Sequence, residues 1–413
     1  MNKTFIKCSV LLLLSLAATR PTLGQVVTTP YSKQGYGLLG DNVSGIQRQM
    51  GGVGYAMQNG RAINVMNPAS YSQVDSLTFL WDLGLELNNV WSSEGSKSGH
   101  NFGGGLDYVT AQFRIANRLG GSFGLLPYSS VGYQFYGTEA TYTESRIGSG
   151  GLTQLYLGAG YEPVKGLSLG ANVSYLFGTI TNTNAISASS VTTYQRVMEV
   201  RDWNLNLGVQ YAAQVTPRDR LVLGLAWTPR KSMHGHAWGV VMDSQDSEAD
   251  TLGYTSMGGH YEQPHTLGVG VSYNRDGRWL AEVDFTYQNW KNAKYHPIEG
   301  FESATWAFDN RWRAAAGLQF SPNHRSSYVG AMAFRMGVFY NHDYMNIAGN
   351  NVRDYGAAVG VGLPVPAGKT TVNLGVEWRH RTSSPTVMIR ENYLNITLGV
   401  NFNELWFWKN KIR

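Results

Sequence analysis

The charged residues that alternate with apolar neighbours are the residues of this chain best suited to chemistry. Arg311 and Arg313 stand two positions apart, and Arg335 lies in the next segment of the same kind. In extended chain this spacing places side chains on one face, where guanidinium groups could hold a ligand carboxylate through paired hydrogen bonds. Other charged residues that alternation places on the same inward face of their segments are Asp82, Glu86, Arg114, Glu282, Asp284, Glu377 and Arg379. The alternative, which we favour, is an electrostatic network that fills a polar interior or holds a plug in place.

Histidine pairs are the other candidates for a chemical site. His234 and His236 share a face near the end of one segment, and His342 precedes Asp343 in another. A zinc site would need a third ligand, which is not visible, so positions in a loop or at a rim are favoured. No nucleophile elbow or paired-carboxylate site stands in a defined context. The sequence therefore assigns no catalytic residue, metal or cofactor, and we do not expect an enzyme.

The segments that carry these residues alternate apolar and polar side chains with a period of two. In one of them Leu394, Ile396 and Leu398 point one way, while Asn395 and Thr397 point the other. Repeated along nearly the whole chain, this pattern implies one continuous apolar surface and one continuous polar surface, as lipid outside and water inside would require. It predicts an all-β fold, a 14-stranded antiparallel transmembrane β-barrel. The strands are expected at 77–91, 103–117, 120–136, 150–162, 166–181, 195–214, 219–236, 258–274, 278–296, 302–321, 326–343, 352–365, 369–381 and 391–405.

The connections between these strands alternate in length. Tight turns rich in Gly, Pro, Asn and Asp alternate with longer polar connections at 92–102, 137–149, 182–194 and 237–257. Short turns are typical of the periplasmic side of such barrels and long loops of the outside. An even number of strands then places both ends of the barrel in the periplasm.

Composition and the N-terminus predict where the protein resides. Residues 1–24 have the basic start, apolar run and small final residue of a signal peptide, and the only cysteine, Cys8, precedes the apolar run. Charged residues make up 15% of the chain, and its net charge of +5 falls to +2 once the three basic residues of 1–24 are removed, which excludes a strong nucleic-acid footprint. The 24 tyrosines and 12 tryptophans suit aromatic girdles at two membrane interfaces. We therefore expect a multi-pass β-barrel in the bacterial outer membrane, in contact with its lipid.

Residues 25–76 differ from the barrel segment, 77–413. They lack sustained alternation and are rich in glycine, yet they contain apolar residues such as Val53, Tyr55 and Ile63. A disordered leader would not need such residues, so a hatch or plug folded into the barrel is the favoured interpretation. The strand 352–365 carries Gly356, Gly360 and Gly362 on its inner face, which leaves open close approach of another backbone or room for passage.

Short motifs in this N-terminal segment resemble those of a known family. Asn67-Pro68-Ala69 follows Met50-Gly51-Gly52-Val53-Gly54, just before the first strand, and resembles the hatch pattern of FadL-type outer-membrane transporters. The third strand, Phe123-Gly124-Leu125-Leu126-Pro127-Tyr128, is similar to the kinked third strand of that family. The resemblance implies fourteen strands, an N-terminal hatch and a sideways exit through the wall, for which Pro127 is the candidate.

The resemblance also implies a function. Members take up hydrophobic or amphipathic small molecules, such as fatty acids and aromatic hydrocarbons, by passive, binding-assisted passage. The alternative is a barrel that transports nothing and serves as a structural subunit of an envelope secretion or assembly machine, with envelope proteins as partners. An apolar pocket running to a side opening would favour uptake, whereas a sealed lumen and a partner-binding rim would favour the structural role.

Overall fold

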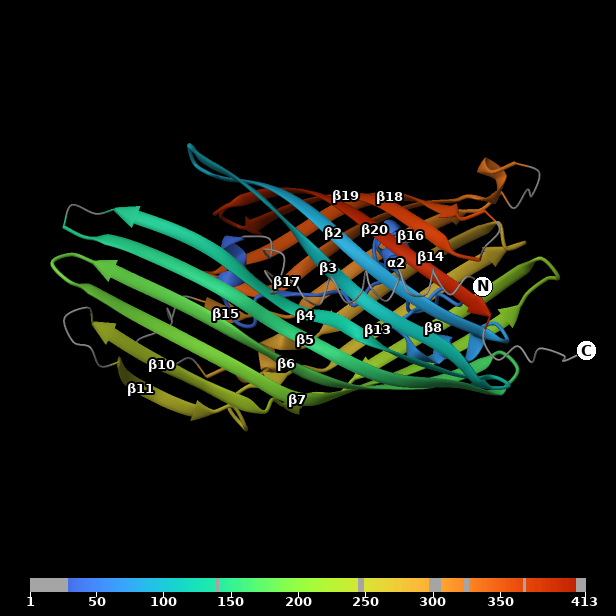
Figure 1. The fold of residues 1–413 in the computed structure, drawn as a ribbon, viewed down its shortest axis with the longest axis horizontal. Helices are drawn as coiled ribbons and strands as arrows, with labels where there is room; N and C mark the ends of the chain where they lie inside the picture. Colours follow the sequence, from blue (N-terminus) through green and yellow to red (C-terminus); the bar gives the residue numbers. More distant parts are fainter. Residues whose placement is uncertain are drawn as a thin grey trace, which may run out of the picture.

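The structure is a computed structural model that describes residues 29–138, 141–243, 249–296, 306–322, 327–366 and 369–405. It is a closed antiparallel barrel of 14 strands that cross the wall, as the alternation predicts (Figure 1). Ten crossings are single strands: β2 (Thr78–Glu94), β3 (Lys97–Ala116), β4 (Leu119–Thr138), β5 (Thr143–Val164), β6 (Leu167–Ser187), β7 (Val191–Gln214), β14 (Trp279–Gln288), β18 (Asn350–Pro364), β19 (Thr371–Ser384) and β20 (Arg390–Leu405). Another is β17 (Ala333–Ile347), and a 3-10 helix, η4 (Val329–Ala331), precedes it.

The remaining three crossings are interrupted. They consist of β8 (Asp219–Thr228), β9 (Lys231–Ser232) and β10 (Gly235–Asp243); of β11 (Ala249–Ser256), β12 (Glu262–Gln263) and β13 (Thr266–Arg275); and of β15 (Trp306–Phe308) and β16 (Arg311–Phe320). Pro229 lies between β8 and β9, and Pro264 between β12 and β13. Because proline cannot donate to a ladder, the pairing stops there and resumes beyond it. A 3-10 helix, η3 (Trp290–Asn292), follows β14.

The barrel closes between its first and last strands. Leu398 of β20 pairs with Leu85 of β2, and the chain order of the crossings is the order of strands around the wall. The described ends of the barrel, Thr78 and Leu405, pair with each other, so they lie at the same end. We take this end as the periplasmic one.

The predicted long loops at the other end are wrong, because most of their residues belong to strands. The β2–β3 hairpin turns at residues 95–96 and the β6–β7 hairpin at residues 188–190, so 92–102 and 182–194 are largely paired. Residues 137–149 likewise contain the end of β4 and the start of β5, and 237–257 contain most of β10 and all of β11. Above the membrane both faces of a strand are polar, as in Thr181–Asn184, so alternation in hydropathy disappears while the ladder continues.

The outer surface carries the apolar faces of the strands. Leu157, Trp203 and Val283, on three different strands, are 65%, 61% and 61% exposed. Such a band around a closed barrel requires lipid, and the protein is an outer-membrane β-barrel. Among the described residues no helix is long and apolar enough to cross a membrane.

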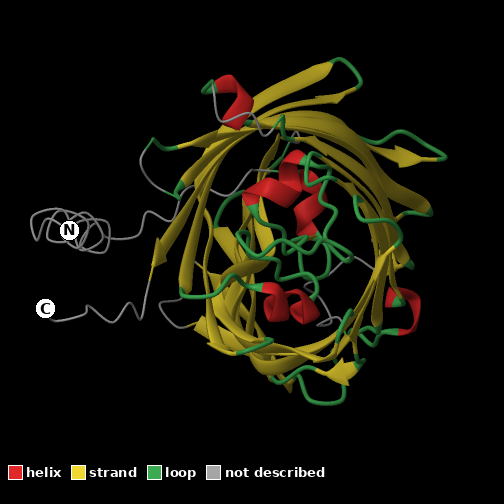
Figure 2. Ribbon diagram, turned by 90° about the vertical axis from the view of Figure 1, so that its right-hand side faces the viewer, coloured by secondary structure: helices red, strands yellow, loops and turns green. Residues whose placement is uncertain are grey.

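The lumen is occupied by residues 29–77, which we call the hatch segment (Figure 2). It contains η1 (Pro30–Lys33), β1 (Leu38–Leu39), α2 (Gly45–Gln49) and η2 (Pro68–Gln73). The short helix α2 begins with a capping box, in which the backbone N–H of Ser44 donates to Gln47 Oε1 at 2.8 Å. Tyr36, Met50 and Val53 are fully buried. The boundary predicted at residue 24 lies outside the described residues.

Candidate functional site

Glycines on the inner wall receive the backbone of the hatch segment. A Cβ atom added at Gly337 of β17 would lie closer than 3.0 Å to backbone atoms of Met50 and Gly51. The same holds for Gly170 of β6 against Pro68. Backbone atoms of the hatch segment lie equally close to Gly120, Gly160, Gly224 and Gly317, whereas the side chains of Asn67 and Gln49 lie close to Gly208 and Gly360. The wall and the hatch segment therefore approach each other at backbone distance along β4–β6, β8, β16 and β17.

The inner glycines of β18 have the same explanation in part. A Cβ atom at Gly360 would meet the side chain of Gln49, whereas one at Gly362 would meet Arg335 and Asn373. At Gly356 the neighbours are Phe339 and the Trp378 carbonyl. Close packing, rather than room for passage, accounts for these positions.

Two carboxylates of β14 hold the hatch backbone by its N–H groups. The N–H groups of Gly54 and Tyr55 donate to Asp284 Oδ2 at 2.6 and 3.0 Å, and that of Ala56 donates to Glu282 Oε1 at 2.8 Å. Both carboxylates are almost fully buried. These three hydrogen bonds anchor the centre of the hatch segment to β14.

The three arginines predicted to share a face each reach the hatch segment. Arg313 donates to the carbonyl oxygens of Gly51 and Gly52 at 2.7 and 3.1 Å. Arg311 forms an ion pair with Asp41 at 2.7 Å, and Arg335 donates to Gln49 Oε1 at 2.8 Å. This is the arrangement of a network that holds a plug, and their role towards a ligand stays a prediction.

Asp41 is the acidic centre of this network. Burial opposes its ionisation, but Arg313, Arg311 and Arg379 together hold the pKa of the Asp41 carboxyl below its usual range. The carboxylate therefore keeps its charge, and the hatch segment stays attached to β16 through it.

Glu377 and Arg379, also predicted as lumen residues, pair with each other at 3.0 Å on β19. The Arg379 guanidinium lies 5.0 Å from the centre of the Phe339 ring, and Asn395 donates to Glu377 at 3.2 Å. These contacts belong to the wall rather than to the hatch segment.

The Asn67-Pro68-Ala69 motif starts η2 and fastens it to the wall. Asn67 Oδ1 accepts from the N–H of Ala69 at 3.2 Å, and Pro68 occupies the first turn, where its missing N–H costs nothing. Asn67 Nδ2 donates to the carbonyl oxygens of Tyr55 at 2.7 Å and of Val209 at 3.2 Å. The motif thus joins the hatch segment to β7.

Four buried or half-buried polar residues of the lumen were not among the predicted site residues: Thr29, Arg48, Asp107 and Glu391. Arg48 of α2 pairs with Glu86 at 3.3 Å and with Asp107 at 2.6 Å. Thr29 Oγ1 donates to Glu391 Oε1 at 2.7 Å. Parity within their strands could have placed Asp107 and Glu391 in the lumen, but Arg48 and Thr29 lie outside any alternating pattern.

An aromatic cluster fills the extracellular half of the lumen. Tyr36 of the hatch segment packs against Trp290 and Phe308, with ring centres 5.7 and 6.2 Å apart. Trp290 also lies 4.7 Å from Tyr344 of β17, and all but Phe308 are nearly completely buried. The space where an apolar ligand would enter from outside is therefore filled with protein side chains.

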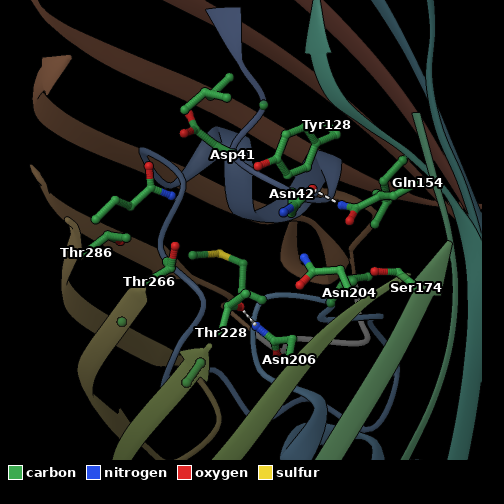
Figure 3. Close-up of a pocket in the computed structure, with 18 of the residues that line it drawn as sticks. Asp41, Asn42, Tyr128, Gln154, Ser174, Asn204, Asn206, Thr228, Thr266 and Thr286 are labelled. Carbon is green, nitrogen blue, oxygen red and sulfur yellow. Dashed lines mark hydrogen bonds between the residues drawn. The ribbon is translucent and has the colours of Figure 1, made fainter. Parts of the chain in front are cut away.

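A cavity of about 120 Å³ lies between the hatch segment and the wall formed by β4–β8, β13 and β14 (Figure 3). Most of its lining is uncharged and polar: Asn42, Tyr128, Gln154, Ser174, Asn204, Asn206, Thr228, Thr266 and Thr286, with Arg311 and Arg313 at one side. Such a lining suits water or a neutral ligand rich in hydrogen-bonding groups, and it does not suit an apolar one.

Pro127 lies where β4 separates from β3. Pro127 does not interrupt β4, which continues to Thr138 and pairs with β5 through a bulge at Tyr128. Pairing with β3, however, ends where Leu125 faces Val109. Proline cannot donate to a neighbouring strand, and the bulge adds a residue that turns the strand. A sideways exit at Pro127 stays a prediction.

The histidine pairs do not form a metal site among the described residues, which contain no cluster of three potential ligands. His234 lies 3.1 Å from Asp202, and His342 Nδ1 lies 3.1 Å from the carbonyl oxygen of Asn310. These contacts stabilise the ends of strands.

Comparison with known proteins agrees with this architecture. The Pseudomonas putida toluene transporter TodX shares 14% identity, with a TM-score of 0.60 over 89% of this chain and 100% of that one. The Ralstonia pickettii toluene transporter TbuX shares 14% identity, with a TM-score of 0.59 over 88% of this chain and 98% of that one. A Pseudomonas aeruginosa FadL homologue shares 10% identity, with a TM-score of 0.62 over 88% of this chain and 99% of that one. At these identities the likeness establishes the FadL-type fold alone.

No curated protein matches the chain significantly in sequence. A family model, in contrast, covers all of it, and that family is BamG, with residues 1–413 matched. The chain, a FadL-like outer-membrane barrel, therefore belongs to the BamG family.

Proposed function

We propose that the protein is a structural subunit of an envelope secretion or assembly machine, a barrel that is held closed and binds other envelope proteins. The observation that carries this proposal is the occupation of the lumen. The hatch segment contacts the wall at backbone distance, and its Gly54–Ala56 N–H groups are held by Asp284 and Glu282.

The contents of the outer half of the lumen support the same proposal. A carrier of apolar compounds needs an apolar pocket reached from outside. Here Tyr36, Trp290 and Tyr344 pack together in that position, and the cavity beneath them is polar. A structural subunit does not need an open lumen, whereas a filled lumen would oppose uptake.

Purification from native outer membranes tests the proposal. A tagged copy of the chain, extracted in mild detergent, is expected to bring down a partner at a constant ratio across size-exclusion fractions. The same protein in liposomes is expected to admit toluene or a medium-chain fatty acid no faster than liposomes without protein. Isolation of the barrel alone, together with saturable uptake, would contradict the structural role.

Uptake of a hydrophobic compound is the second candidate, and the parting of β3 and β4 beyond Leu125 and Val109 favours it. The fold is shared with proteins described as toluene transporters and as a monoaromatic hydrocarbon channel. In this case Pro127→Val combined with deletion of Tyr128 should restore the ladder and abolish uptake. Normal uptake by that variant would exclude a sideways exit at this place.

A further inference from the structure

One edge of β3 has no partner over half its length. The ladder between β3 and β4 extends only from Ala116 to Val109, whereas pairing of β3 with β2 continues to Lys97. In Figure 1 the β2–β3 hairpin leans away from β4. Within the described part of the chain, no ladder or other backbone hydrogen bond involves the side of residues 97–108 that faces away from β2.

This open edge lies partly at the depth of the membrane. Phe102 and Leu106 point outward and are 61% and 56% exposed. Phe102 pairs with Asn89, which pairs with Leu394 near the top of the apolar face of β20. Acyl chains offer no hydrogen bonds, so an open sheet edge does not persist in hydrocarbon unless protein covers it.

On the other side of the gap between β3 and β4, the edge of β4 is already covered. Leu38 and Leu39 of β1 pair with Ser130 and Ser129 of β4. The N–H of Thr29 donates to the Gly132 carbonyl at 2.7 Å, and that of Gly40 to the Tyr128 carbonyl at 2.8 Å. The hatch segment thus takes the place beside β4 that β3 leaves, and only the β3 edge is available.

We propose that the β3 edge between Gly99 and Leu106 is the docking site for an extended strand of another envelope protein, which joins the sheet by β-augmentation. The proposal rests on the structural role proposed above. The added strand satisfies the open N–H and C=O groups and presents apolar side chains to lipid next to Phe102 and Leu106. Gly103, Gly104 and Gly105 allow it to approach without hindrance from side chains.

A second copy of this chain cannot occupy the edge. Copies inserted in the same direction are related by rotation about the membrane normal. Barrel strands are tilted by about 35–45° from that normal, so two β3 strands related in this way would cross at roughly 70–90°. A ladder requires nearly parallel or antiparallel strands. This excludes a second copy, and the proposed occupant is a different polypeptide.

Photo-crosslinking in native membranes tests the site in the intact chain. Benzoylphenylalanine is placed at Phe102 or Leu106, with Val283 of β14 as the matched position in the apolar band elsewhere on the barrel. We expect one adduct with a different protein from the β3 positions, at least tenfold above Val283. Cysteines in the crosslinked segment of that protein should then form disulfides with cysteines in β3 at every second position. An adduct between two copies, equal yields at Val283, or reaction with lipid alone would overturn the proposal.

Proline substitution provides a second measurement. Neighbouring residues of a strand direct their N–H groups to opposite edges, so Gly103→Pro and Gly104→Pro form a matched pair. The variant that loses the donor of the open edge should keep heat-modifiable migration and lose at least tenfold of the copurified partner. Unchanged partner ratios in both variants would overturn the proposal.

The two proposals fail differently. A stoichiometric complex whose adducts map to other strands would remove the β3 site and leave the structural role intact. Absence of any fixed complex would remove both.

Discussion

Asp284 is expected to control how often the hatch segment opens. Its Oδ2 atom accepts hydrogen bonds from Gly54 and Tyr55, at 2.6 and 3.0 Å. Hydrogen bonds to a charged acceptor contribute about 1.5–3 kcal/mol each, and a buried N–H left without a partner adds to the loss. Asp284→Ala should therefore lower the free energy of hatch opening by about 3–6 kcal/mol.

Cysteine labelling measures this free energy. Met57 is buried in the hatch segment, close to the affected N–H groups, and the predicted mature chain contains no cysteine. A maleimide should react with Met57→Cys only in the open state, so its rate reports the opening equilibrium. Since about 1.4 kcal/mol corresponds to a factor of ten, Asp284→Ala should speed labelling by at least about 10²-fold.

Two further variants separate anchoring from general damage. Asp284→Asn keeps an acceptor without the charge and should fall between the wild type and Asp284→Ala. Asp276→Ala removes an exposed carboxylate at a turn and should change nothing. Labelling of the Asp284→Ala protein within threefold of the wild-type rate would refute the view that β14 holds the hatch segment closed.

Three other predictions concern the same closed lumen. Gly337→Val should displace the backbone at Met50 and raise conductance in planar bilayers. Gly137→Val is the control and should not raise conductance, because the space around its Cβ position is open. Equal effects of the two substitutions would exclude backbone packing as the cause. Unboiled protein should migrate faster in SDS than boiled protein because the ladder closes, and identical migration would count against a closed barrel. The pKa of Asp41 is lowered by its arginines, so its stabilising contribution is complete above the unfolded value of about 3.9 and is lost only as pH falls through the lower folded value. Asp41→Asn should thus raise conductance above the wild-type value at every pH from 8 to 4, and the difference should vanish only in stronger acid; a difference that vanishes near pH 6 would show that Asp41 does not make this contribution.

The sequence predicts the wall well because lipid imposes a simple rule on it. Each outward residue in the band must be apolar, so the period of two locates the strands and separates outward Leu394 from inward Asn395. The rule ends where lipid ends. That is why the paired residues beyond Trp91 in β2 and beyond Thr181 in β6 are expected as loops.

The hatch segment is harder to predict because its structure depends on contacts with distant strands. Asp41 matters through Arg311, and Gly54 through Asp284, both more than 200 residues away in the chain. Parity shows that Arg311 and Asp284 face the lumen, but no local pattern shows what they touch there. The glycine at position 337 has an evident partner only once Met50 is placed against it.

The closed lumen and the one-sided parting depend on the same residues. Residues 29–40 cover the edge of β4, and Thr29 also joins Gly132 of β4 to Glu391 of β20. A hatch movement large enough to open a channel on this side would break these contacts and expose a second strand edge beside the first. The cost of that exposure opposes opening, whereas a strand added to β3 leaves residues 29–40 in place. A barrel that binds a partner at β3 can therefore stay closed while it does so, which a sideways exit through the same parting could not.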